Sequence, residues 1–147
     1  MKRHQIIYCL AFMLISLTPC FAHHMAVVVN KENGVENISS AHLAKIIKSD
    51  SRKWPSGIDI VLVLHRASKG EMLTLQKLNN MSEAELKSRL DARKDTVILV
   101  DSDADVLDKV QATPGAIGLV EVRSVNGQVK VVKVDGRLPL ENGYLPD

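Results

Sequence analysis

The sequence predicts a single α/β domain, and three observations lead to this prediction. Short apolar runs rich in Val, Ile and Leu alternate with segments of helical periodicity. The chain has 147 residues, a length that suits one compact domain. No internal repeat, low-complexity tract or linker interrupts residues 23–147. Strands separated by helices favour a mixed, mainly parallel sheet with helices packed on its faces.

The first half of the domain shows this alternation clearly. Residues 26–29 form an unbroken apolar run, which is typical of a strand buried on both faces. Ser39 or Ser40 then caps a helix whose apolar residues fall on one side. Residues 51–57 have the composition of a turn, and residues 58–64 form a second apolar strand.

Three further helices are predicted from a serine that precedes an acidic residue by three positions. The first two pairs fit a capping box, and the acid of the third pair favours the helix dipole from the first turn. A central strand is predicted at residues 96–100, between the last two helices. The pairs are Ser68 and Glu71, Ser82 and Glu85, and Ser102 and Asp105.

The end of the domain is predicted to be a β-hairpin. Residues 113–115 form a turn into a strand at residues 116–122. Asn126-Gly127 is the composition of a two-residue hairpin turn, and it leads into residues 129–134. We therefore expect a C-terminal hairpin to close the sheet.

Residues 1–22 have the features of a secretory signal peptide: a basic start, an apolar run over residues 6–17 and a small residue, Ala22, at the end. The apolar run is shorter than the roughly 20 residues of a membrane-spanning helix. We expect cleavage after Ala22, an exported domain over residues 23–147, and no membrane span. Lipidation at Cys20 is the alternative, but Pro19 directly before the cysteine is unusual in a lipoprotein box, so the cleaved signal is favoured.

Composition excludes several classes of function. Removal of residues 1–22 lowers the formal charge from +2 to zero, which argues against a nucleic-acid-binding protein. Both cysteines lie in residues 1–22, so the exported domain has no disulfide, cysteine nucleophile or cysteine metal site. The acidic run at residues 101–105 lacks the glycine and the final acid of a calcium loop. The common hydrolase, zinc-protease and phosphate-loop motifs are also absent from the sequence, so we expect no catalytic residue, metal or cofactor.

Residues 65–71 are the most informative segment, because they join the end of a predicted strand to the start of a helix. Ligands of open α/β sheets collect at this edge, and unpaired amides at a helix N-terminus favour an oxyanion. Arg66 could donate two parallel hydrogen bonds, Lys69 could add a positive charge, and Ser68 could donate its hydroxyl unless it caps the helix. The alternative is an ordinary capped loop, which Glu71 favours because it brings negative charge to the same place.

Several segments together resemble the phosphate-binding proteins of ABC transporters, and more closely the short, single-lobe relatives found among small exported bacterial proteins. The resemblance covers about residues 26–144. It implies a single lobe of a type II periplasmic-binding-protein-like fold, located in the periplasm and non-catalytic, that binds phosphate or a similar oxyanion in connection with ABC-type transport. The matching segments are Val27 to Asn30, Trp54-Pro55-Ser56-Gly57, the strand that ends at Arg66, Thr113 to Gly118, Val134 to Pro139, and Tyr144.

The ligand loop of that family has the pattern Arg-x-x-Ser-Gly-Thr before a helix. Arg66 and Gly70 match its arginine and glycine, Lys69 and Glu71 stand at its serine and threonine, and Ser68 lies one place early. The resemblance therefore implies Arg66, Ser68, Lys69 and Gly70 as ligand-binding residues.

The size of the chain bears on its partners. The transporter proteins enclose their ligand between two lobes, and a chain of one lobe cannot close over an ion alone. A second subunit or an envelope protein is therefore an expected partner. The alternative function is a periplasmic scaffold that has lost anion binding and that uses a surface such as the Trp54 loop to bind a partner.

Overall fold

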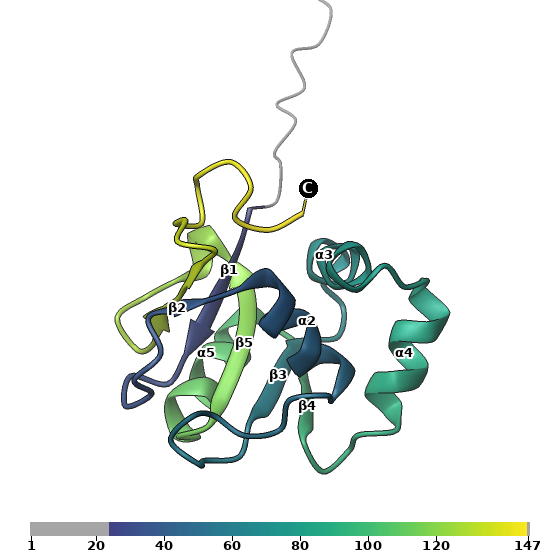
Figure 1. Cartoon of the computed structure of the whole chain (residues 1–147), viewed down its shortest axis with the longest axis horizontal. Helices are drawn as coiled ribbons and strands as arrows, with labels where there is room; N and C mark the ends of the chain where they lie inside the picture. Colours follow the sequence, from purple (N-terminus) through teal and green to yellow (C-terminus); the bar gives the residue numbers. More distant parts are fainter. Residues whose placement is uncertain (1–23, 147) are drawn as a thin grey trace, which may run out of the picture.

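The computed structural model describes residues 24–146 and confirms the α/β class. A five-stranded sheet has the order β4-β3-β5-β1-β6 (Figure 1). β3 is parallel to β4 and β5, whereas β1 is antiparallel to β5 and β6, so four of the five strands point the same way. The strands are β1 (Met25–Val29), β3 (Val61–His65), β4 (Val97–Val100), β5 (Ala116–Glu121) and β6 (Lys130–Val131).

Helices cover both faces of the sheet, as the predicted architecture requires. α2 (Ser40–Lys48) and α3 (Lys69–Asn79) lie on one face, and α5 (Asp103–Ala112) lies on the other (Figure 1). α4 (Glu83–Asp91) packs against α3 at the side of the molecule.

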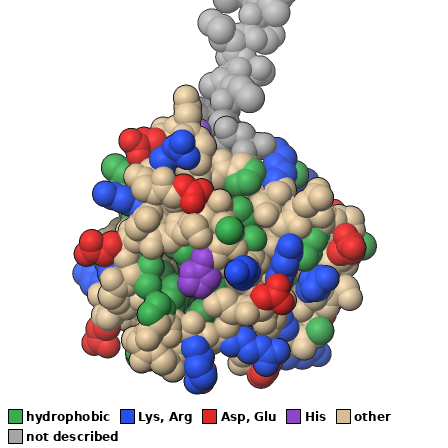
Figure 2. Space-filling model, viewed as in Figure 1, with side chains coloured by type: hydrophobic (Ala, Val, Ile, Leu, Met, Phe, Trp, Pro, Cys, Tyr) green, Lys and Arg blue, Asp and Glu red, His purple; other side chains and the backbone are tan. Residues whose placement is uncertain are grey.

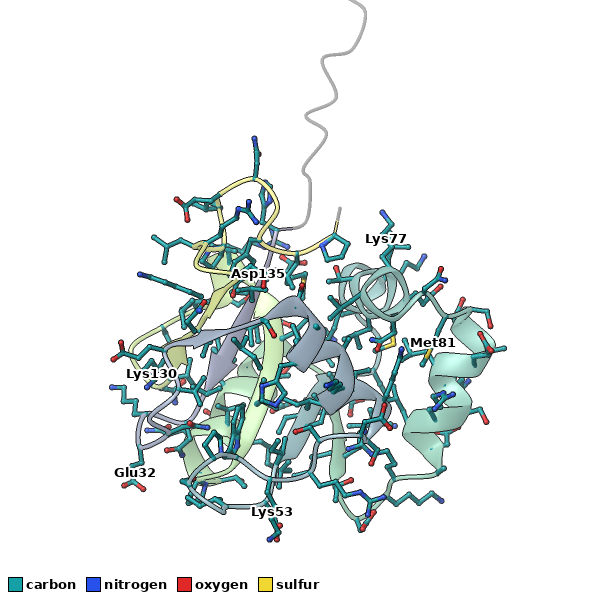
Figure 3. The ribbon with its side chains drawn as sticks, viewed as in Figure 1. Glu32, Lys53, Lys77, Met81, Lys130 and Asp135 are labelled. Carbon is teal, nitrogen blue, oxygen red and sulfur yellow. The ribbon has the colours of Figure 1, made fainter. Side chains whose placement is uncertain are left out.

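Charged side chains lie on the outside of this layered structure. Figure 2 shows Lys and Arg together with Asp and Glu on the same face of the molecule. Glu32, Lys53 and Lys77 are exposed and extend away from the ribbon in Figure 3. This mixture agrees with the neutral charge expected for residues 23–147.

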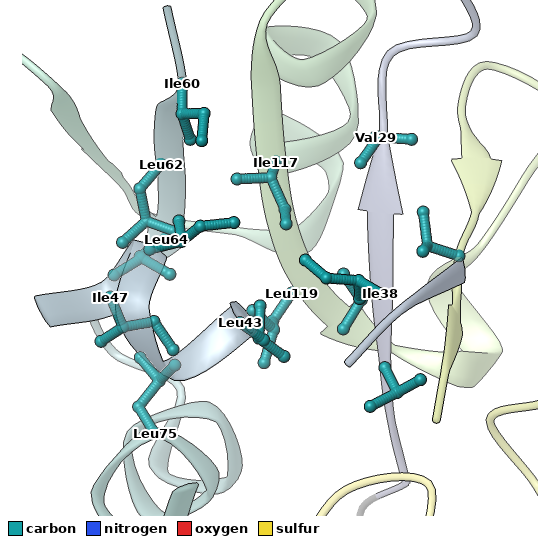
Figure 4. Close-up of a cluster of buried hydrophobic side chains, with 14 of the residues drawn as sticks. Val29, Ile38, Leu43, Ile47, Ile60, Leu62, Leu64, Leu75, Ile117 and Leu119 are labelled. Carbon is teal, nitrogen blue, oxygen red and sulfur yellow. The ribbon is translucent and has the colours of Figure 1, made fainter. Parts of the chain in front are cut away.

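The core consists of aliphatic side chains that alternate between the two faces of the sheet. In β3, Leu62 and Leu64 face α2 and α3, whereas Val63 faces α5. In β1, Val28 likewise contributes to the cluster under α5, and both of its neighbours contribute to the opposite cluster. Figure 4 shows the larger cluster, in which Leu43, Ile47 and Leu75 from the helices meet the strands.

The predicted serine caps are confirmed at all four helices. Ser39, rather than Ser40, caps α2, and the caps of the other three helices are Ser68, Ser82 and Ser102. A reciprocal capping box forms at Ser82 but not at Ser68. The reason is that the Glu71 side chain turns inward and accepts a hydrogen bond from a different backbone amide.

The predicted C-terminal hairpin is wrong, because β1 lies between β5 and β6. The expected turn needs positive φ at both central residues, but neither Asn126 nor Gly127 has it. A 3₁₀ helix, η1 (Val122–Ser124), follows β5 instead, and β6 pairs with β1. β1 is buried along its whole length, so its backbone groups need partners on both edges, and this long-range requirement overrides the local turn preference.

The last part of the chain is held to the sheet by a tyrosine. β7 (Lys133–Val134) leaves the main sheet and pairs in parallel with β2 (Asn37–Ile38). The buried Tyr144 hydroxyl bridges β1 and the residue before β7: it donates to the Val132 carbonyl at 2.7 Å and accepts from the Val27 amide at 3.0 Å. Burial raises the pKa of Tyr144 to about 12, so the phenol stays protonated and keeps this donor.

The predicted signal peptide, its cleavage after Ala22 and the alternative at Cys20 lie outside the described residues. Within residues 24–146, no helix combines the length and the apolar character needed to cross a membrane.

Candidate oxyanion site at the start of α3

The candidate site lies where β3 and β4 end. The chain leaves β3 toward α3 on one face of the sheet and leaves β4 toward α5 on the other face. In open α/β sheets, ligands bind at the carboxyl ends of two such neighbouring strands. Arg66 continues the pairing of β3 with β4, because its backbone amide donates to the Val100 carbonyl at 3.0 Å.

The guanidinium of Arg66 is exposed but already has partners. Its Nε donates to Asp101 Oδ1 at 2.9 Å, and its Nη2 reaches the Leu99 carbonyl at 3.4 Å. Asp101 follows β4, so the pair joins the two strand ends that form the predicted binding edge. The side chains of Arg66 and Asp101 are 57% and 78% exposed, and a pair of this kind contributes only about 0 to 1 kcal/mol.

Ser68 uses its hydroxyl oxygen to cap α3. Ser68 Oγ accepts from the Glu71 amide at 3.2 Å. Of the two roles that the sequence left open for this hydroxyl, helix capping and ligand binding, the structure shows capping. The amides of Lys69 and Gly70 belong to the first turn, where N–H groups have no intrahelical acceptor and carry the positive end of the helix dipole. These two amides and the exposed Lys69 side chain are the positive groups at the start of α3.

The structure brings three of the four candidate residues together. Arg66, Ser68 and Lys69 line one open groove of about 450 Å³, which continues along α3 to Glu83. Gly70 lines a second groove of about 290 Å³, between α3 and residues 139–146. The two grooves lie on either side of α3 and share Leu73, so the structure places Gly70 in a different groove from the other three candidate residues.

Glu71 is the residue that sequence reasoning placed wrongly. Its side chain is fully buried, and both carboxylate oxygens lie 3.2 Å from the backbone amide of His65. Burial raises the pKa of Glu71 well above its ordinary value, and the nearby charge of Asp103 acts in the same direction. Its spacing of four residues from the buried Leu75 puts both on the inner side of α3, and this was the available signal.

His65 and Asp103 form a second contact between a basic and an acidic side chain, next in sequence to the pair of Arg66 and Asp101. His65 Nδ1 lies 3.0 Å from Asp103 Oδ1, and both side chains are mostly buried. The other oxygen of Asp103 accepts from Ser124 Oγ at 2.8 Å and from the Glu121 amide at 3.0 Å. Asp103 therefore connects the ends of β3 and β5 to the start of α5, and the carboxylates of this chain already occupy part of the binding edge.

The two motifs that carry the family resemblance contact one another. Trp54 Nε1 donates to the Gly115 carbonyl at 3.0 Å, and the indole is only 3% exposed. A Cβ at Gly115 would lie 1.9 Å from the Asp59 carbonyl oxygen, so only glycine fits there. Trp54 is consequently a core residue, so a partner surface on the Trp54 loop would have to use the exposed residues 55–57 rather than the indole.

No group of three or more His, Cys, Asp or Glu side chains within residues 24–146 has an arrangement that could hold a metal ion.

The fold matches one lobe of periplasmic-binding-protein-like α/β structures, and the solved structures similar to it include phosphate transport proteins. An ABC-type phosphate transport receptor from Vibrio cholerae superposes with a TM-score of 0.66 and 23% identity, over 79% of this chain and 48% of that chain. A phosphate ABC transporter substrate-binding protein from Clostridium perfringens, solved with bound phosphate, has a TM-score of 0.67 and 22% identity, over 79% of this chain and 46% of that chain. PstS from Borrelia burgdorferi has a TM-score of 0.64 and 22% identity, over 79% of this chain and 49% of that chain.

These comparisons confirm the resemblance at the level of the fold. The chain spans about half the length of the solved proteins that it matches. No family model matches the sequence, and neither does any curated protein.

Proposed function

We propose that the chain is an exported, non-catalytic binding lobe that holds phosphate or a similar oxyanion at the start of α3, in connection with ABC-type transport. The observation that supports the proposal is the open groove in which Arg66, Ser68 and Lys69 surround the first turn of α3. The similar solved proteins include phosphate transport proteins, one of them with phosphate bound, which is why phosphate is the first candidate.

The anion would accept hydrogen bonds from the Lys69 and Gly70 amides and from the Arg66 guanidinium. Asp101 competes with it, because the carboxylate already accepts from Arg66 Nε. Displacing an exposed pair costs little, about 0 to 1 kcal/mol. The groove is open to water and salt, so we expect weak binding that falls as ionic strength rises.

Titration calorimetry of the exported domain with inorganic phosphate at low salt tests the proposal. Saturable heat is expected from the wild type and none from Arg66→Ala. Asp101→Asn is the informative companion, because it removes the competing charge and leaves Arg66 in place. Its affinity for phosphate should rise by about three- to tenfold, which corresponds to about 1 kcal/mol. If neither the wild type nor Asp101→Asn responds to phosphate or sulfate at millimolar concentration, the chain is not an oxyanion-binding lobe.

A scaffold without a small ligand is the second candidate function. The observation that favours it is that the two basic side chains at the strand ends, Arg66 and His65, already contact the acids Asp101 and Asp103. In that case Arg66→Ala and Asp101→Asn would leave phosphate titrations flat and would change the melting temperature only slightly, since the pair is exposed.

A further inference from the structure

The groove that contains Arg66 and Lys69 is larger than a single oxyanion needs. Its volume of about 450 Å³ falls in the range of roughly 300 to 1,000 Å³ that is typical of pockets for small organic molecules. The two basic side chains lie at one end, and the walls continue along α3 to the start of α4. An oxyanion bound at the basic end would therefore leave the rest of the groove unfilled.

The middle of the groove is apolar. Met72 and Leu73 line it, about one helical turn beyond Lys69. Leu73 is 50% exposed and is one of four large hydrophobic side chains that are exposed in residues 24–146. A ligand that covers this side chain removes apolar surface from water, and this removal favours binding.

Polar side chains end the apolar part of the groove. Gln76 lies about 10 Å beyond Lys69 along the helix axis. Glu83, at the first position of α4, comes after the turn in which Met81 lies between the two helices (Figure 3). The apolar part is therefore short, so it suits a chain of a few carbon atoms rather than a long acyl chain.

We propose that the ligand of this groove is a phosphate monoester with a short aliphatic chain. The inference rests on the proposed function, because the phosphate group would occupy the oxyanion site beside Arg66 and Lys69. A monoester keeps three phosphate oxygens as hydrogen-bond acceptors, so these contacts are not lost. Its chain would run along α3 and cover Met72 and Leu73. The groove of a single lobe is open, which leaves room for a ligand that extends beyond its phosphate group.

Amide chemical shifts of the exported domain at low salt test the inference, with inorganic phosphate, methyl phosphate and hexyl phosphate as probes. The first two should shift only the amides of residues 66–70, whereas hexyl phosphate should also shift those of Leu73 and Gln76. Hexyl phosphate should bind about three- to tenfold more tightly than methyl phosphate, because a fully buried methylene adds about fourfold and an open groove buries the chain in part. Arg66→Ala should weaken all three probes, since they share the phosphate group.

Two leucine variants locate the aliphatic chain. Leu73→Gln should abolish the advantage of hexyl phosphate and leave the affinity for inorganic phosphate unchanged. Leu140→Gln is the matched control and should keep the advantage, because Leu140 is 70% exposed and lines only the groove on the other side of α3.

The outcomes separate this inference from the proposed function. If phosphate binds but hexyl phosphate has no advantage, or if Leu73→Gln keeps the advantage or Leu140→Gln removes it, the inference is overturned and the oxyanion site stands. If none of the three probes binds at millimolar concentration, the oxyanion site is absent and both are overturned.

Discussion

Glu71 shows how one buried carboxyl group can change the character of a site. As a capping acid it would have contributed an exposed negative charge beside Lys69. Its carboxylate instead lies inside the domain on the His65 amide, and no basic side chain is recorded as its partner in the described part of the chain. A buried carboxylate without a cation strongly favours its neutral form. The carboxyl group that counted against an oxyanion therefore lies inside the domain and not at the exposed start of α3.

The stability of the domain should consequently depend on the protonation of Glu71. The folded state holds a proton that the unfolded chain releases above the ordinary pKa of 4.5, so the free energy of unfolding falls as the pH rises from there through the raised folded pKa. Glu71→Gln keeps an oxygen for the His65 amide and cannot ionise. We expect it to raise the free energy of unfolding at neutral pH by about 1 to 3 kcal/mol.

Urea denaturation from pH 5 to pH 8 measures this effect. The fall in stability with pH should flatten in Glu71→Gln. Glu85→Gln is the matched control, because Glu85 occupies the same position in α4 but is exposed, and it should keep the wild-type slope. An unchanged slope in Glu71→Gln would show that this carboxyl group does not titrate differently in the folded state.

At the scale of elements, two glycines in the loops before and after β5 differ in whether packing requires them. Gly115 stands where the Trp54 loop crosses the start of β5, and a Cβ there would overlap backbone at 1.9 Å. Gly127 lies in the turn predicted to make a hairpin, yet its φ is not positive and nothing lies within 4 Å of a Cβ.

Alanine substitutions distinguish the two turns. Gly115→Ala should lower the free energy of unfolding by about 2 kcal/mol or more, because backbone must move to make room. Gly127→Ala should change it by less than about 0.5 kcal/mol. Thermal denaturation of both variants checks this. A large loss in Gly127→Ala would mean that the hairpin turn exists after all.

The elements also show what a sequence can predict about this fold. The helix starts were predictable because Ser39, Ser82 and Ser102 act on amides within the next three residues. The pairing of β6 was not, since it depends on what the distant β1 needs at its open edge.

The candidate site, too, was predictable from the sequence only in part. The place of Arg66 at a strand end followed from local pattern, whereas its pairing with Asp101 depends on the register between β3 and β4. No spacing in the sequence indicates which of several acids a basic side chain will meet.

At the scale of the whole molecule, export is the prediction that stands outside the described structure. The intact mass of the protein recovered from an envelope fraction should correspond to a chain that begins at His23. Ala22→Arg removes the small residue needed at the cleavage position and should leave the longer precursor. A mass that begins at an acylated Cys20 would contradict simple cleavage and would place the protein on a membrane by a lipid anchor.

The interior place of β1, between β5 and β6, has a consequence for how the domain forms. This strand comes first in residues 24–146, but its neighbours β5 and β6 and the tyrosine that completes its edge all come from the last part of the chain. Pairings between such distant segments form late and slowly, because a long loop must close before they gain anything. A chain emerging from its N-terminus therefore cannot complete the pairing of β1 until the segments around β5, β6 and Tyr144 are free, so the sheet forms only after most of the domain has emerged.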